Sequence, residues 1–117
     1  MRETCTPLVM GEALSGMKAT DPPATGKYND PMMPVAWTNM FKASSGTAVR
    51  AFTTTMGASE DFASEGLRRL LVNATYWTLG MENQIAEQSA VDLVGEFRIS
   101  PYGNDRYVKD VKPSSLK

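Results

Sequence analysis

The residues best placed to do chemistry lie in one short segment, 53–59, which reads Thr-Thr-Thr-Met-Gly-Ala-Ser. Gly57 permits a tight backbone path between an extended segment and the helix expected after it. The amides at a helix start point toward whatever lies in front of them and favour an electron-rich ligand. The sequence therefore indicates a ligand site at this turn. The alternative is that Ser59 only caps the helix and the threonines are ordinary strand residues.

Five residues form the candidate ligand site around this turn. They are Trp37, Thr38, Thr55, Gly57 and Ser59. Trp37 stands near the end of an extended segment, where its ring face could stack on a sugar. Trp77 falls on the apolar stripe of the expected helix and is assigned to the core. Glu60 and Asp61 could suggest acid–base chemistry, but adjacent helical side chains diverge by about 100°, so we interpret both as charges that favour the helix start.

The amino-acid composition excludes most of the known sets of catalytic residues. The chain has no histidine, which excludes Ser-His-Asp and Cys-His catalysis and histidine-containing zinc sites from its own chemistry. Its single cysteine, Cys5, cannot form an internal disulfide and is interpreted as an incidental thiol. Asp21, Asn29 and Asp30 fit no calcium loop and are expected to serve turns. We predict no catalytic residue, metal or cofactor for this chain alone. Acyl transfer by Ser59 is disfavoured because, without histidine, it would need a lysine as its base.

The charge and hydropathy of the chain limit the classes of partner that it is expected to bind. Twelve basic and thirteen acidic residues leave a net charge of −1, and no basic cluster is interleaved with aromatics, so nucleic acid is not an expected partner. No apolar run approaches the ~20 residues of a membrane span, and no signal peptide is recognisable. A cytoplasmic location is the default expectation. With 42% hydrophobic and 21% charged residues, the 117-residue chain is typical of one globular domain at most.

Two extended segments are expected to form an antiparallel hairpin. The first spans 35–41 and the second 47–56, with a five-residue polar connection at 42–46. Arg50 in the middle of the second segment needs a partner or an exit to solvent, and a structural role is the favoured one. A short apolar run at 6–10 could be a strand or an extended arm, and the breaker-rich stretch 16–34 is expected to be a loop.

A helix is predicted from Glu60 to Gly80. Ser59 is the expected N-cap, and Gly80 is the expected stop after the last periodic residue. The predicted buried stripe contains Ala63, Leu67, Leu70, Leu71, Ala74, Trp77 and Thr78. A short polar turn of helix should follow Met81, then an extended segment at 91–97, and residues 101–117 are expected to form an extended tail.

Three segments carry a resemblance to a known family. Residues 29–38 read Asn-Asp-Pro-Met-Met-Pro-Val-Ala-Trp-Thr, 50–58 read Arg-Ala-Phe-Thr-Thr-Thr-Met-Gly-Ala, and 65–77 read Glu-Gly-Leu-Arg-Arg-Leu-Leu-Val-Asn-Ala-Thr-Tyr-Trp. Together they resemble the ThuA-like, or trehalose-utilisation, domain, and Val-Asp-Leu-Val-Gly-Glu at 91–96 is similar to the tail of many bacterial members. The resemblance covers residues 1–100 and implies the carboxyl-terminal half of that domain.

The resemblance implies an α/β fold of the flavodoxin-like, class I glutamine amidotransferase-like type. It implies a partial sheet with the antiparallel hairpin, one long packed helix and a free edge where the strands of an amino-terminal half would lie. Many family members carry a histidine where this chain has Ala58, so catalysis by this chain alone is not expected. The expected function is binding of trehalose or a related sugar at the Gly57 turn. The alternative is a noncatalytic structural or protein-interaction module of the same fold. The partners expected for a fragment are a second copy of the chain or a missing amino-terminal half.

Overall fold

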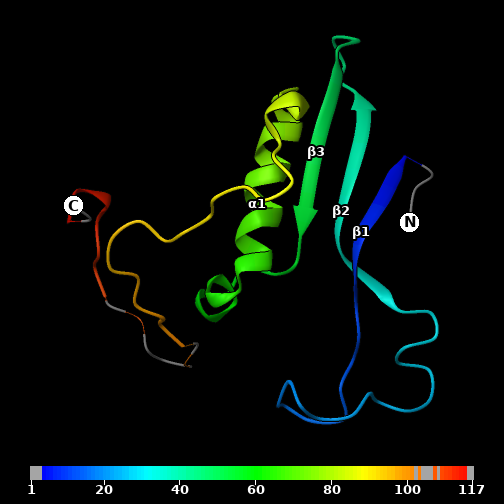
Figure 1. Ribbon diagram of the computed structural model, residues 1–117, viewed down its shortest axis with the longest axis vertical. Coiled ribbons are helices and arrows are strands. Elements are labelled where there is room, and N and C mark those ends of the chain that lie inside the picture. Colours follow the sequence, from blue (N-terminus) through cyan, green and yellow to red (C-terminus); the bar gives the residue numbers. More distant parts are fainter. Residues whose placement is uncertain (1–3, 102, 104–106, 108, 116–117) are drawn as a thin grey trace.

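A three-stranded antiparallel sheet and one α-helix make up this mixed α/β structure, a computed structural model that describes residues 4–101, 103, 107 and 109–115 (Figure 1). The main elements are β1 (Cys5–Gly11), β2 (Met33–Lys42), β3 (Ala48–Thr54) and α1 (Glu65–Thr78). Short 3-10 helices span Ser59–Ala63, Glu82–Gln84 and Pro113–Ser115. The predicted α/β class, the hairpin and the single long helix are confirmed. Of the predicted tail, residues 102, 104–106, 108, 116 and 117 lie outside the described part.

The hairpin of β2 and β3 lies one residue from its predicted turn. Its register runs without a break from Lys42 opposite Ala48 to Ala36 opposite Thr54. The connection is closed by the Ala43 N–H, which donates to the Thr47 carbonyl at 2.8 Å. Within the connection Gly46 has φ +84°, a conformation that glycine adopts without steric cost.

The apolar run near the amino end forms a strand rather than a free arm. β1 pairs antiparallel with β2, from Cys5 opposite Asn39 to Gly11 opposite Met33, with register shifts around Val9. Pro7 is tolerated because β1 is an edge strand among the described strands. Since both β1 and β3 run antiparallel to β2, their carboxyl ends lie at the same end of the sheet, where α1 also begins (Figure 1).

Helix α1 packs on one face of the sheet and lies beside β3 (Figure 1). Ala36, Leu67, Ala74 and Val91 are the buried apolar residues in the described part of the chain. The molecule exposes 9734 Å² of surface, whereas a compact monomer of this size exposes about 6,300 Å². The chain as a whole, including its loops and carboxyl-terminal segment, therefore exposes much more surface than a compact monomer, and the core between one helix and three strands is thin.

The predicted start of the helix was wrong. Residues Ser59–Ala63 form a 3-10 helix, and Ser64 is the true N-cap of α1, with its Oγ accepting from the Leu67 N–H at 3.4 Å. The Asp61 carboxylate explains the difference, because it turns back to bind the amides of the preceding loop instead of extending a regular helix. Ala63 is consequently exposed.

The rest of the predicted stripe is only partly right. Leu67 and Ala74 are buried, while the other members within α1 are half-buried. These are Leu70, Leu71, Trp77 and Thr78. The buried face of α1 was predicted correctly, but the three-stranded sheet is too narrow to bury every residue of the stripe.

The predicted helix stop at Gly80 is confirmed. Gly80 has φ +72°, and its N–H donates to the Trp77 carbonyl at 3.1 Å. The Met81 N–H donates to the Tyr76 carbonyl at 2.9 Å. These two bonds form a Schellman motif, which satisfies the last carbonyls of the helix. The polar turn predicted after Met81 is the 3-10 helix Glu82–Gln84.

Arg50 ties the sheet to the end of the helix, as its predicted structural role requires. Its Nη1 donates to the Trp77 carbonyl at 2.7 Å and also binds the Glu82 carboxylate. Its guanidinium carbon lies 5.2 Å from the centre of the Trp77 ring. The mid-strand charge is therefore satisfied by an ion pair, a carbonyl and an aromatic face.

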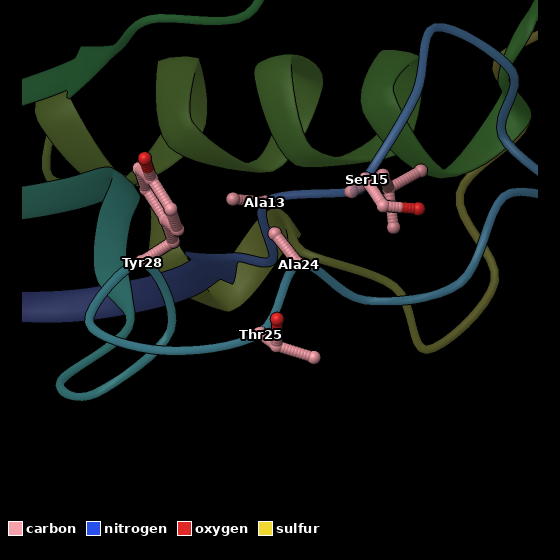
Figure 2. A pocket seen from close by; sticks show the side chains of 6 residues that line it. Ala13, Ser15, Ala24, Thr25 and Tyr28 are labelled. Atoms are coloured by element: carbon pink, nitrogen blue, oxygen red, sulfur yellow. The ribbon is translucent and has the colours of Figure 1, made fainter.

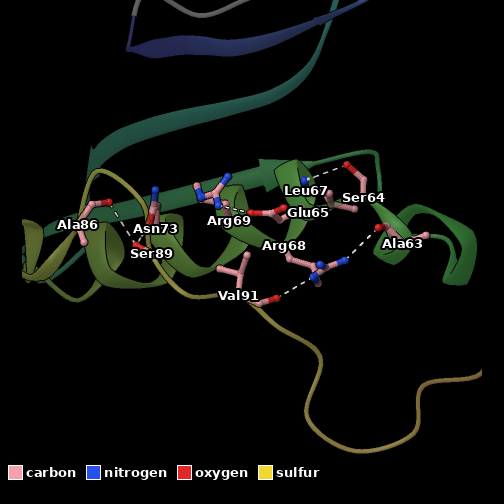
Figure 3. A network of polar contacts seen from close by, with 10 residues as sticks. All are labelled: Ala63, Ser64, Glu65, Leu67, Arg68, Arg69, Asn73, Ala86, Ser89 and Val91. Carbon is pink, nitrogen blue, oxygen red and sulfur yellow. Dashed lines mark hydrogen bonds and ion pairs between the residues drawn. The ribbon is translucent and has the colours of Figure 1, made fainter.

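Arg68 fastens the chain that follows the helix. Its Nε donates to the Val91 carbonyl at 2.7 Å, and its Nη1 donates to the Ala63 carbonyl at 3.0 Å (Figure 3). The same Nη1 also donates to the Phe62 carbonyl at 2.7 Å. The segment predicted as extended at 91–97 forms no strand, and Arg68 holds its first residue, Val91. From Val91 to Pro101 the chain runs on the side of α1 away from the sheet (Figure 1).

The Arg50 anchor predicts a large loss when its side chain is removed. Arg50→Ala should lower the free energy of unfolding by about 2 kcal/mol, because a charged hydrogen bond to a carbonyl is lost with the ring contact. Urea unfolding followed by circular dichroism measures this. Arg69→Ala is the matched control, since Arg69 is equally exposed and its ion-pair partner among the described residues is Glu65, one helical turn away. This change should cost about 0.5 kcal/mol. Equal losses would contradict the anchor.

The same anchor predicts a pH dependence. The pKa of the Glu82 carboxyl lies below its ordinary value of 4.5. The largest cause is a hydrogen bond from the backbone amide of Glu82 itself, and the next is the hydrogen bond from Arg50. Because the folded pKa is the lower one, this carboxylate stabilises the fold above the unfolded pKa, and the contribution disappears as the pH falls through the folded pKa. The stability gap between wild type and Glu82→Gln should therefore narrow below about pH 4.5. If the difference in stability between wild type and Glu82→Gln stayed constant in acid, the Arg50–Glu82 ion pair would not contribute as described.

Candidate functional site

The structure separates the five predicted site residues. Thr38, in β2, faces α1, whereas Trp37 points to the opposite face of the sheet because side chains alternate along a strand. Thr55 follows β3, and its N–H donates to the Val35 carbonyl at 2.9 Å. The Ser59 Oγ accepts from the Ser100 N–H at 2.9 Å. The five residues therefore do not converge on one pocket.

The Gly57 turn is occupied by the chain's own carboxylate. Gly57 has φ +144°, and both its N–H and that of Ala58 donate to Asp61 Oδ2 at 2.9 Å. These are the amides that the sequence offered to an electron-rich ligand. Asp61 fills that role internally, which agrees with its interpretation as a capping charge. An external anion would have to displace it.

A cavity beside this turn lies between the start of α1 and the sheet. It measures about 230 Å³ and is lined by Val9, Met56, Asp61, Ser64, Gly66, Leu67 and Leu70. Gly66 contributes no side chain, which keeps the floor of the cavity open at the helix start. The walls are apolar apart from the Asp61 carboxylate and the Ser64 hydroxyl.

A second cavity continues along the same helix and shares Leu70 with the first. It measures about 290 Å³ and is lined by Leu8, Thr38, Leu70, Asn73, Ala74, Trp77 and Ile85. Here a threonine hydroxyl, an asparagine amide and an indole ring meet in one hollow. We call the two cavities together the α1 groove.

Sequence reasoning missed Asn73 as a site residue. Asn73 is absent from the predicted buried stripe and from the five predicted site residues, yet it lies one turn from Trp77 and Leu70 on the groove side. Its Oδ1 accepts from the Ser89 hydroxyl at 3.3 Å (Figure 3), and its amide nitrogen carries two further donors. The spacing of Leu70, Asn73 and Trp77 could have placed it there.

A further pocket lies in the loop between β1 and β2. It measures about 370 Å³ and is lined by Ala13, Leu14, Ser15, Ala24, Thr25 and Tyr28. Figure 2 shows Tyr28 and Ser15 on opposite sides of it. The Asn29 amide shapes this loop, donating to the carbonyls of Ala13 at 2.9 Å and Ala24 at 3.1 Å. Asp21 accepts from the Lys18 N–H at 2.8 Å and so serves a turn as predicted, whereas Asn29 joins parts of the loop that are 5 and 16 residues away from it.

The remaining chemistry is sparse. Within the described ranges, no cluster of three or more histidine, cysteine, aspartate or glutamate side chains could hold a metal ion. Cys5 is a half-buried free thiol at the edge of the sheet. None of the helices that the structure describes is both long and apolar enough to cross a bilayer.

Comparisons with known proteins give this chain no relative. No family model, no curated protein and no solved structure matches it.

The Asp61 contacts predict a measurable cost for opening the turn. Asp61→Ala should destabilise the protein by about 1 kcal/mol, because the amides of Gly57 and Ala58 lose their acceptor. Glu60→Ala is the control, since Glu60 is adjacent and exposed. Thermal unfolding of both variants measures the difference. If the two variants unfolded at the same temperature, Asp61 would not close the turn.

Proposed function

We propose that this chain is the carboxyl-terminal part of a ThuA-like domain and serves carbohydrate utilisation by binding a sugar in the α1 groove. The groove begins beside the Gly57 turn, where sugar binding was expected, and leads to Thr38, Asn73 and Trp77. A hydroxyl, an amide and an indole in one hollow are groups that suit a polyol, and this juxtaposition carries the proposal.

The charge of the groove also favours a neutral ligand. Asp61 is the ionisable side chain among the described residues that line the two cavities, and its Oδ2 is engaged by the turn. No cationic side chain lines either cavity within the described part of the chain. A phosphorylated or carboxylated sugar would therefore gain less here than trehalose or another uncharged sugar.

The flavodoxin-like, class I glutamine amidotransferase-like fold belongs to the same proposal. It is supported by the order of β3, glycine turn and α1, and by the surface left open on the sheet. Every described strand pairing is antiparallel, whereas a flavodoxin-like sheet is mostly parallel. The proposal therefore makes β1–β3 the antiparallel part of a larger mixed sheet, whose parallel strands would lie beyond a free edge.

A noncatalytic structural or interaction module is the second candidate. The observation that favours it is the Gly57 turn, whose amides are taken by Asp61 instead of being left to a ligand. The absence of histidine from the chain agrees with it. In that case the groove is a packing defect of a thin core and binds no sugar.

Titration calorimetry with trehalose and with oxidised sugars distinguishes the two candidates. Thr38→Val and Asn73→Leu each keep the approximate shape of the groove and remove hydrogen-bonding groups. Each should weaken sugar binding about tenfold, as expected when one net hydrogen bond is lost. Thr53→Val, an exposed threonine on a neighbouring strand that lies outside the groove, should bind like the wild type.

The absence of binding heat for either class of sugar would contradict the groove proposal and favour the interaction module. Binding that is unchanged in both groove variants would show that the sugar lies elsewhere. Circular dichroism of each variant verifies that the fold is retained.

A further inference from the structure

The Asp61 carboxylate at the Gly57 turn keeps one oxygen available. Both amide bonds of the turn, from Gly57 and Ala58, go to its Oδ2 at 2.9 Å. Among the described residues, no donor is bonded to its Oδ1. Because each oxygen of a carboxylate accepts hydrogen bonds, Oδ1 can receive a donor from a ligand. A cationic ligand therefore leaves the turn closed, whereas an anion would have to displace Asp61.

Within the described part of the chain, no positive side chain pairs with this carboxylate. The first cavity of the α1 groove, which Asp61 lines, has no lysine or arginine among its described lining residues. The arginines of α1 are engaged elsewhere, since Arg68 binds three backbone carbonyls and Arg69 binds Glu65. The negative charge of Asp61 is therefore free to pair with a positive charge on a ligand.

The rest of the first cavity suits a short carbon chain. The other polar side chain in its lining is the Ser64 hydroxyl, and the apolar walls are Val9, Met56, Leu67 and Leu70. An ionic hydrogen bond is stronger beside such walls than in open water. The cavity measures about 230 Å³, whereas sites for drug-sized ligands measure about 300–1,000 Å³. It therefore selects a small ligand.

Gly66 keeps this cavity open in the first turn of α1. Glycine is a poor helix former, and the backbone does not require it here. A Cβ at position 66 would meet the Ser64 Oγ at 3.6 Å, which is an ordinary contact. The fold could therefore accept a better helix former at this position. The effect of the glycine is the room that it leaves beside Asp61.

We propose that the first cavity binds a small primary amine in its charged form. The ammonium group donates to Asp61 Oδ1, and the carbon chain lies against Val9, Met56 and Leu70. Such charge-assisted N–H···O bonds are about twice as strong as neutral ones. This inference goes beyond the proposed sugar and does not rest on it, because the hydroxyl and amide offered to a sugar line the second cavity.

Three probes with the same carbon chain test the proposal: n-butylammonium, 1-butanol and butyrate. Each is titrated into the full chain at neutral pH, where an alkylamine is protonated like lysine. Nuclear magnetic resonance follows the backbone amides of Gly57, Ala58 and Gly66. Butylammonium should bind about tenfold more tightly than 1-butanol, as expected for one hydrogen bond to a charged group. Butyrate should bind most weakly.

Two variants and a matched control assign the preference to this cavity. Asp61→Asn keeps an oxygen for the turn amides but removes the charge, so butylammonium should bind no better than 1-butanol. Glu60→Gln removes the same charge from the adjacent exposed position outside the cavity and should leave the preference unchanged. Gly66→Leu introduces a good helix former whose side chain covers the preceding turn. It should weaken binding of both probes about tenfold, and circular dichroism verifies each fold.

Equal affinity of the wild type for butylammonium and 1-butanol would overturn the proposal. A preference that survives Asp61→Asn, or that Glu60→Gln also abolishes, would overturn it as well. Asn73→Leu, in the second cavity, should leave butylammonium binding unchanged, so failure of amine binding and failure of sugar binding are separate results.

A lysine side chain carries the same ammonium group, and acetyl-lysine amide distinguishes a protein-borne amine from a free one. It should bind more weakly than butylammonium, because its amide groups would lie against the apolar walls. Tighter binding of acetyl-lysine amide would overturn the assignment of the cavity to a small free amine.

Discussion

The packing of one 14-residue helix across a three-stranded sheet is the constraint on which the rest of this structure depends. A helix is about 10 Å wide, and strands lie nearly 5 Å apart, so α1 can cover little more than β3 and part of β2. Arg50 fixes its position by joining the sheet to Trp77 and Glu82 at the helix end. Two consequences follow. A groove remains between α1 and β1, and no helix of the described residues packs on the opposite face of the sheet.

The chemistry of the groove follows from how α1 begins. Asp61 binds the amides of Gly57 and Ala58, which delays the helix until Ser64. The delay places Gly66 opposite Val9 and opens the first cavity. The site therefore combines a closed turn with a hollow lined mainly by uncharged groups. Such a site can bind and orient a neutral ligand, but it holds no described pair of groups that could move a proton to and from one.

Much of the fold could be predicted from the sequence where the signals are local. The hairpin followed from alternation and a short polar connection, and the helix end followed from Gly80. The helix start could not, because Ser59 and Ser64 are both good N-caps and the choice depends on where the Asp61 side chain turns. Arg50 was predicted to need a partner, but Glu82 lies 32 residues away and no local pattern identifies it. For the predicted site, Thr38 lines the α1 groove, whereas Trp37 shares its strand but points to the other face.

Among the described elements, α1 is the helix that packs on the sheet, and it covers one face. Phe41 and Phe52 test it directly, because they are the same residue type on neighbouring strands and point to opposite faces. Hydroxyl-radical footprinting with mass spectrometry, done in dilute solution, measures their solvent exposure. The structure predicts that Phe41, which is 47% exposed, is oxidised faster than the half-buried Phe52, which lies under α1. Equal protection of both phenylalanines at the lowest concentration would contradict it.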